Sequence, residues 1–210
     1  MILETLLLTS LYFECGENVH PEVLHSIVKT ESAQNPYVIA NVTDGTSLYL
    51  DTKEEAISKA NELKESGKKY SVGLMQIYSE NFNHYDLNNE NAFDYCQNIK
   101  TGAKILKACY KKSEKENPDF SHDAHLENAM SCYYRGNFSR GFKKDEGLNT
   151  SYVERIRNNQ TSIFEIPSFY NYSKFEFKEG NLMNNTTKRE NQNEIFINQH
   201  WDVFNDYEKL

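Results

Sequence analysis

The sequence has little positive charge, no long apolar run and few cysteines. Its 23 Lys and Arg residues are outnumbered by 31 Asp and Glu residues, so the 210-residue chain has a formal charge of −8. A nucleic-acid-binding protein needs a positive surface to displace the counterions of the phosphates, and this charge balance disfavours that class. No stretch approaches the roughly 20 apolar residues of a membrane span. Four cysteines are too few for a cysteine-rich scaffold and enough for two disulfides.

The hydrophobic content sets the size of the core. The 210 residues are enough for one large or two small domains, and 38% hydrophobic residues are enough for a core.

Residues 1–14 are mostly apolar, but no Lys or Arg precedes the apolar stretch and Glu4 lies inside it, which makes a poor signal peptide. We expect this segment to form a helix that packs on the core; a truncated or unusual export signal is the alternative.

Helical periodicity dominates the middle of the chain. The spacing of apolar residues predicts helices over residues 20–34, 52–67, 92–112, 123–134 and 152–157. Pro21 suits the first turn of the first helix, and the residue before Pro36 is pushed out of the helical region, which ends it. A capping box of Thr52 and Glu55 starts the second helix. Between these two helices, residues 37–51 read as two short β-strands about an Asp44-Gly45 turn.

These elements predict a mainly α protein of the α+β class. Residues 15–158 form one helical domain with a small β-hairpin insertion. Residues 159–210 are rich in Asn and aromatic residues and have no sustained period, so we expect a poorly structured tail. Within the tail, residues 173–177 are either an edge strand or, as we favour, a flexible segment that docks on a partner.

Glu31 stands out because it continues an apolar helical stripe. Leu24, Ile27 and Val28 recur at three- and four-residue spacing, and the next position on that face is Glu31. A carboxylate directed at the interior has its neutral form favoured and its pKa raised, which suits a general acid near neutral pH. The alternative is a glutamate at a helix end that turns outward or pairs with a basic residue.

Two further segments combine polar groups with apolar neighbours. Gln76 lies between Met75 and Ile77, where its amide needs partners at both ends; a sugar hydroxyl, an acetamido group or the backbone all serve. Tyr133 and Tyr134 end a helix just before a glycine turn, and tyrosines there either stack on sugar rings and bond a catalytic carboxylate or belong to the core. Tyr152 has the same two interpretations.

Two metal-binding motifs are incomplete. Asp86, Asn88 and Glu90 alternate like the start of a calcium loop, but an asparagine replaces the turn glycine and a glutamine stands at the bidentate position. His122 and His125 have no nearby set of cysteines or carboxylates that completes a zinc site. We therefore expect no metal and no cofactor, and we interpret both histidines as surface residues.

Taken together, the segments resemble a known family. In this order, Glu31-Ser32 with Asn35-Pro36, residues 73–77, the turn at 133–136 and Tyr152-Val153 resemble the lysozyme-like lytic transglycosylases of bacterial cell walls. The insertion between residues 41 and 73 and the stretches 93–103 and 131–137 resemble the branch that accompanies type IV secretion and conjugation systems. Each motif is short, but four of them lie in register over residues 15–157.

The resemblance implies a lysozyme-like fold and a peptidoglycan lytic transglycosylase. Such an enzyme cleaves the bond between N-acetylmuramic acid and N-acetylglucosamine with formation of a 1,6-anhydro sugar, and Glu31 matches its single catalytic acid and base. Tyr133 matches the tyrosine of the family's Ala-Tyr-Asn motif, and Tyr134 departs from it, because most relatives have asparagine there. The implied substrate-binding residues are Ser32, Ser71, Gly73, Met75, Gln76, Tyr133, Tyr134 and Tyr152.

The implied setting is the periplasm or cell envelope. Peptidoglycan glycan strands are the expected partner, and components of a type IV secretion or conjugation apparatus are a second partner, contacted through the tail. The weak export signal conflicts with this setting. A lysozyme-type hydrolase and a non-enzymatic peptidoglycan-binding assembly protein are the alternative functions.

The four cysteines have two possible pairings. Cys96 and Cys109 lie 13 residues apart on one expected helix, or about 20 Å, whereas bridged Cα atoms are only about 4.4 to 6.8 Å apart. This leaves Cys15 to pair with either of them and Cys132 with the other. The resemblance favours Cys15 with Cys96 and Cys109 with Cys132. Four reduced, buried thiols are the alternative.

Overall fold

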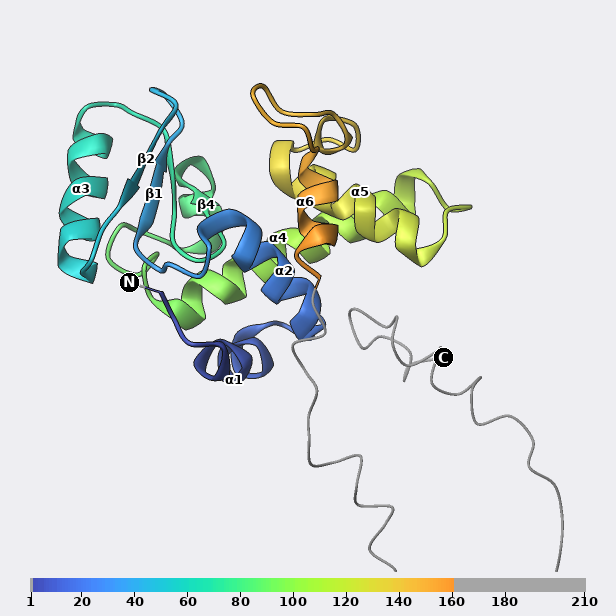
Figure 1. Cartoon of the computed structure of the whole chain (residues 1–210), viewed down its shortest axis with the longest axis horizontal. Coiled ribbons are helices and arrows are strands. Elements are labelled where there is room, and N and C mark those ends of the chain that lie inside the picture. Colours follow the sequence, from blue (N-terminus) through green and yellow to red (C-terminus); the bar gives the residue numbers. More distant parts are fainter. Residues whose placement is uncertain (1, 161–210) are drawn as a thin grey trace, which may run out of the picture.

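The computed structural model describes residues 2–160 (Figure 1). Its α-helices are α1 (Thr5–Cys15), α2 (Pro21–Ser32), α3 (Lys53–Glu65), α4 (Tyr95–Glu116), α5 (His122–Arg135) and α6 (Tyr152–Asn158). Two 3-10 helices are η1 (Ser79–Tyr85) and η2 (Arg140–Phe142), and the strands are β1 (Val38–Asn41), β2 (Thr46–Tyr49), β3 (Tyr70–Val72) and β4 (Ile77–Tyr78). The expected tail, with its candidate strand at 173–177, lies outside the described residues from position 161 onward.

The helices begin and end where local chemistry predicts. Pro21 opens α2, and Ala33, with a φ of 49°, ends it in the left-handed region just before Asn35-Pro36. The capping box of Thr52 and Glu55 is present at the start of α3. The expected helix over 92–112 begins later, at Tyr95, because Asp94 accepts a hydrogen bond from the Gln97 amide and acts as its N-cap.

The sheet is larger than the predicted hairpin. Strands β1 and β2 pair about the predicted turn, and the full antiparallel order is β2-β1-β3-β4. Ser71, one of the implied substrate-binding residues, lies in β3. Strands of three and two residues are too short to show a period of two, so the pattern of the sequence does not reveal β3 and β4.

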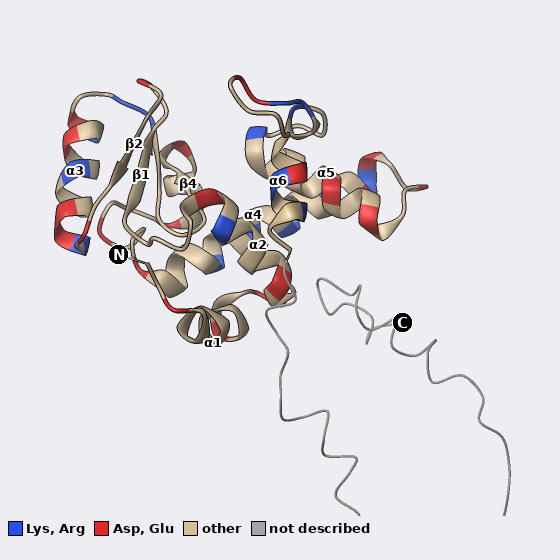
Figure 2. Ribbon diagram, in the orientation of Figure 1, with Lys and Arg blue, Asp and Glu red and all other residues tan. Residues whose placement is uncertain are grey.

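The elements surround the central helix α4. Figure 1 shows the sheet and α3 on one side and α5 with α6 on the other, with α2 and α4 between them. Helix α3 buries Ala56, Ala60 and Leu63, while its acidic and basic residues lie on the rest of its surface (Figure 2). The fold is thus mainly α with one small sheet, as predicted. Among residues 2–160, no helix is both long enough and apolar enough to cross a membrane.

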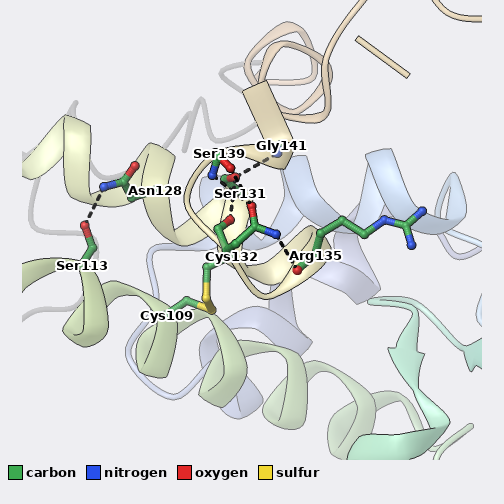
Figure 3. Close-up of a disulfide and its surroundings, with 9 residues drawn as sticks. Cys109, Ser113, Asn128, Ser131, Cys132, Arg135, Ser139 and Gly141 are labelled. Carbon is green, nitrogen blue, oxygen red and sulfur yellow. Dashed lines mark hydrogen bonds between the residues drawn. A yellow bond between two sulfur atoms is a disulfide. The ribbon is translucent and has the colours of Figure 1, made fainter. Parts of the chain in front are cut away.

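Two disulfides link the helices, in the pairing that the resemblance favours. Cys15 at the end of α1 is joined to Cys96 at the start of α4, with Cα atoms 5.3 Å apart. Cys109 of α4 is joined to Cys132 of α5 across the helical hairpin, with Cα atoms 5.7 Å apart (Figure 3). The alternative of four reduced thiols does not describe this structure.

One histidine differs from expectation. His125 is buried, not on the surface, and its Nδ1 lies 2.9 Å from Ser113 Oγ, which also accepts a hydrogen bond from the Asn128 amide (Figure 3). This polar cluster fills the interface between α4 and α5. Within residues 2–160, no group of three or more His, Cys, Asp or Glu side chains is arranged to hold a metal ion.

Candidate active site

A cleft of about 790 Å³ lies between the sheet and the α4–α5 hairpin. Residues of β1, β2, β3 and η1 form one wall, and residues of α4 and α5 form the other. Five of the residues predicted to act at the site line it: Glu31, Ser71, Gln76, Tyr133 and Tyr134. The structure thus brings together segments that lie up to a hundred residues apart in the sequence.

Glu31 reaches the cleft from the last turn of α2. The preceding members of its stripe, Leu24, Ile27 and Val28, are fully buried in the core, and Glu31 itself is half-buried. Within the described residues it is the only acidic side chain that lines the cleft. The stripe therefore carries one carboxyl group from the core to the edge of the cleft.

The surroundings of Glu31 favour its protonated form. Burial raises the pKa of the Glu31 carboxyl from 4.5 to about 7, against the opposing effects of a hydrogen bond from the Tyr152 hydroxyl and the positive charge of Arg155. The Tyr152 hydroxyl donates directly to Glu31 Oε1. A carboxyl group of this kind holds a proton near neutral pH and is oriented to release it, which are the requirements for a general acid.

Replacing Tyr152 with phenylalanine tests this arrangement. The hydrogen bond lowers the pKa of Glu31, so its loss raises that pKa further, and the alkaline limb of the pH profile should move to higher pH. The carboxyl group also loses its orientation, and we expect kcat/KM at the optimum to fall roughly tenfold, the value of one hydrogen bond to a charged group. The measurement is the pH profile, between pH 5 and 9, of the peptidoglycan-clearing activity that the resemblance implies.

A matched control is Tyr70→Phe. The Tyr70 hydroxyl is also buried, but it donates to Asn89 Oδ1 at 2.6 Å, away from the cleft. We expect this variant to keep the parent's pH profile. An alkaline limb that moves to lower pH in Tyr152→Phe, or one that moves equally in both variants, contradicts the role given to Tyr152.

A network around Asp145 holds Tyr152 in place. The Tyr152 ring stacks on the Tyr134 ring with centroids 4.5 Å apart and planes 8° apart. Asp145 Oδ1 accepts hydrogen bonds from the Tyr134 hydroxyl and from Arg140, both at 2.9 Å, and Oδ2 accepts one from Arg155 at 2.8 Å. These contacts lower the pKa of Asp145 against the effect of burial, which raises it. Asp145 thus connects the end of α5, η2 and α6 behind the carboxyl group of Glu31.

The turn between β3 and β4 places Gln76 on the opposite wall. Gly73 has a φ of 81°, which favours glycine, and a Cβ there would lie 2.3 Å from Asn98 Nδ2. The Gln76 amide donates to the carbonyl oxygens of Val38 at 3.0 Å and Gly73 at 2.9 Å. The backbone therefore satisfies the amide nitrogen of Gln76, one of the alternatives that the sequence left open.

Helix α4 holds the β3–β4 turn through the side chain of Asn98. The buried Asn98 side chain accepts a hydrogen bond from the Met75 amide at 2.8 Å and donates to the carbonyl oxygens of Val72 and Ala92. Gly102, one turn further along α4, leaves room for the Met75 side chain, because a Cβ there would lie 2.4 Å from Met75 Sδ. The turn is thus held by the hydrogen bonds of Asn98, and the lack of a side chain at Gly102 lets Met75 pack against α4.

Tyr133 joins the two walls. Its hydroxyl donates to the Met75 carbonyl oxygen at 2.7 Å, while the preceding residue in the chain, Cys132, forms the disulfide to α4. Burial raises the pKa of Tyr133, and the nearby Glu31 carboxylate adds to the rise, so the phenol stays protonated as a donor. Tyr133 therefore ties α5 to the β3–β4 turn directly beside Glu31.

Four of the predicted substrate-binding residues do not line the cleft. Ser32, Gly73, Met75 and Tyr152 are all buried. The Ser32 hydroxyl donates to the Val28 carbonyl oxygen of its own helix at 3.0 Å. The geometry therefore gives these four residues supporting positions beneath the residues that face the cleft.

Three residues of the site are absent from the sequence prediction: Asn98, Asp145 and Arg155. Asn98 lies next to Ile99 on the buried side of the long helix, and a buried asparagine needs several partners, which is a usable signal. Asp145 lies in an irregular segment with no period, so nothing local distinguishes it from a solvated acid.

The model of the transglycosylase SLT domain family matches residues 11–152 of this chain. Similar proteins include the type IV secretion system protein virB1 of Brucella abortus and that of Brucella suis, each 37% identical over 143 residues, or 68% of this chain and 59% of the relative. Protein virB1 of Rhizobium radiobacter is 29% identical over 150 residues, or 71% of this chain and 59% of the relative. The chain thus spans a little over half the length of these relatives. No solved structure matches it.

Proposed function

Because this chain belongs to the transglycosylase SLT domain family, we propose that it is a peptidoglycan lytic transglycosylase. It cleaves the bond between N-acetylmuramic acid and N-acetylglucosamine. The observation that carries the proposal is Glu31, a half-buried carboxyl group with a pKa of about 7, placed at the edge of a cleft of about 790 Å³.

One carboxyl group is sufficient for this reaction. Glu31 protonates the glycosidic oxygen, the N-acetyl group of the muramic residue assists at the anomeric carbon, and the Glu31 carboxylate then takes the proton of the muramic 6-hydroxyl for internal attack. The product is a 1,6-anhydro sugar. Most inverting and retaining hydrolases use a second carboxyl group, roughly 6.5–9.5 Å away in inverting enzymes and about 5–5.5 Å away in retaining ones. No second acidic side chain of the described residues lines this cleft.

Residues beneath and along the cleft position the acid and the glycan. Tyr152, which lies beneath the cleft, orients Glu31, and the Tyr134 ring stacks on the face of the Tyr152 ring. Ser71, Gln76 and Tyr133 line the two walls, and the Ser71 hydroxyl, the amide oxygen of Gln76 and the ring of Tyr133 suit contacts with sugar hydroxyl groups, acetamido groups and ring faces.

The names of the relatives support a cellular role. Their name, type IV secretion system protein virB1, supports a role in opening the cell wall for a type IV secretion or conjugation apparatus. The enzyme then acts in the periplasm or cell envelope, and two disulfides within residues 2–160 fit an oxidising compartment. Contact between residues 159–210 and the apparatus is part of the proposal.

Mass spectrometry of the fragments released from purified peptidoglycan tests the activity. We expect fragments that end in 1,6-anhydro-N-acetylmuramic acid, 18 Da lighter than hydrolysis products, since water is not added. Fragments with reducing ends would identify the protein as a lysozyme-type hydrolase, in which water attacks. Binding without any released fragment would identify it as a non-enzymatic peptidoglycan-binding protein. Either of these results contradicts the proposal.

A further inference from the structure

Two cationic side chains line the cleft, Lys112 of α4 and Arg135 of α5. Both are exposed to solvent. The only acidic side chain of the described residues that lines the cleft is Glu31, whose pKa of about 7 keeps at least half of it neutral up to that pH. The α4–α5 wall is thus a positive surface in a chain with a formal charge of −8.

These two cations have aromatic rings as neighbours. The guanidinium carbon of Arg135 lies 4.9 Å from the centroid of the Tyr134 ring, and Lys112 Nζ lies 5.3 Å from the centroid of the Phe138 ring. The remaining arginines of residues 2–160 pair with carboxylates: Arg140 and Arg155 with Asp145, and Arg157 with Glu127. An aromatic ring restrains the position of a cationic side chain without neutralising its charge, so Lys112 and Arg135 can both bind an anion.

The two cations lie on opposite sides of the Cys109–Cys132 disulfide. Each follows its cysteine by three residues, and the helices are antiparallel, as the contact of Ser113 with Asn128 one turn away shows. They are therefore separated by about 9 Å along the helix axes, which is the length of two to three extended residues. Figure 3 shows the Arg135 side chain extending from the end of α5, beyond the disulfide.

We propose that Lys112 and Arg135 form an anion-binding subsite for the free carboxylates of the stem peptides that the glycan strand carries. The inference rests on the proposed function, because a strand in the cleft brings its stem peptides alongside this wall. The lactyl carboxyl group of each muramic residue forms the amide bond to its stem peptide, so the free carboxylates of the stem peptides are the anions that such a strand offers. The planar fork of Arg135 suits a bidentate carboxylate contact, and Lys112 supplies a point charge further along the peptide.

The subsite gives a physical role to the departure at position 134. The family resemblance predicts asparagine there, whereas Tyr134 supplies the ring over which the Arg135 guanidinium lies. The Tyr134 ring is itself fixed by the stack on Tyr152 and by the hydrogen bond from its hydroxyl to Asp145. Asparagine offers no ring, so in this chain the tyrosine both supports the acid and directs the cation.

The test measures binding of glycan strands to the Glu31→Gln variant, which leaves the strands intact. The probes are strands with their stem peptides and the same strands after carbodiimide coupling to methylamine, which converts the stem-peptide carboxylates to uncharged amides. An exposed ion pair strengthens binding about two- to fivefold, so we expect the Glu31→Gln variant to bind intact strands roughly tenfold more tightly than amidated strands at low salt. Adding Lys112→Gln and Arg135→Gln should remove most of this preference, and added salt should weaken it because these charges are exposed.

A charge-matched control is Glu31→Gln with Lys111→Gln and Lys143→Gln. Both lysines are exposed and neither lines the cleft, so the preference for intact strands should persist. If the Glu31→Gln variant binds both kinds of strand equally tightly, the subsite is wrong. It is also wrong if Lys112→Gln and Arg135→Gln weaken the binding of both kinds of strand by the same factor. Failure of the parent to release anhydro fragments contradicts the proposed function instead, and the binding comparison still decides on the subsite.

Discussion

The Glu31→Gln variant should lose most of its activity on peptidoglycan while it remains folded. A positioned general acid and base contributes on the order of 10² to 10⁴ to the rate, and glutamine cannot transfer the proton. The substitution changes little else, since the amide oxygen still accepts the hydrogen bond from Tyr152 and the size of the side chain is preserved. The measurement is the initial rate of peptidoglycan clearing together with the amount of anhydro fragments.

The stability of this variant provides a second readout with a defined sign. Burial raises the pKa of Glu31 from 4.5 to about 7, so the folded protein holds this proton more tightly than the unfolded chain. The contribution of Glu31 to stability is therefore greatest below pH 4.5 and declines as the pH rises toward 7. Removing the ionisable group should raise stability at pH 8 relative to the parent, by at most about 3 kcal/mol, and should have little effect at pH 4.

Glu80→Gln is the matched control. Glu80 lies on η1 near the cleft, but it is exposed and pairs with Lys69 at 3.1 Å without lining the cleft. We expect parental activity and no gain in stability at pH 8. If Glu31→Gln clears peptidoglycan as fast as the parent, Glu31 is not the catalytic acid and another group must supply the proton.

The sequence predicts the fold best where a local signal is strong. Caps and prolines mark the start of α2 and α3, and the Asp44-Gly45 turn marks the first two strands, because these effects act within one turn of the chain. Strands β3 and β4 carry no such signal. They exist because β1 offers a free edge and Asn98 of α4 holds the turn between them, and both causes lie far away in the sequence.

The candidate site follows the same rule. Glu31 is predictable because it belongs to a helical stripe whose other members are apolar, so its direction is set locally. The supporting position of Ser32 is not predictable in this way. Ser32 follows Glu31 in the same helix, so its side chain points about 100° away from that of Glu31, and its hydroxyl bonds to the Val28 carbonyl oxygen of its own helix. Asp145 and Arg155 are recognised only once the chain has folded, since their partners come from three separate segments.

Removing the Cys15–Cys96 disulfide should cause the largest loss of stability. The bond closes a loop with a sequence separation of 81 residues, and in the chain-entropy description such a loop restricts the unfolded chain by about 4.5 kcal/mol. This is a large share of the roughly 5–15 kcal/mol that stabilises a typical domain. We expect Cys15→Ala with Cys96→Ala to lower the urea midpoint strongly. Neither cysteine lines the cleft, so activity well below the new midpoint should stay close to that of the parent.

The second disulfide should show the opposite balance between stability and activity. Cys109 and Cys132 are separated by only 23 residues, for which the same description gives about 3.4 kcal/mol, so Cys109→Ala with Cys132→Ala should unfold at a higher urea concentration than the first pair. Both of these cysteines line the cleft, however, and Cys132 precedes Tyr133, whose hydroxyl holds the β3–β4 turn. Freeing α5 from α4 should therefore reduce activity more than replacing Cys15 and Cys96 does. The reverse order in both measurements contradicts the view that one disulfide restrains the chain and the other restrains the cleft.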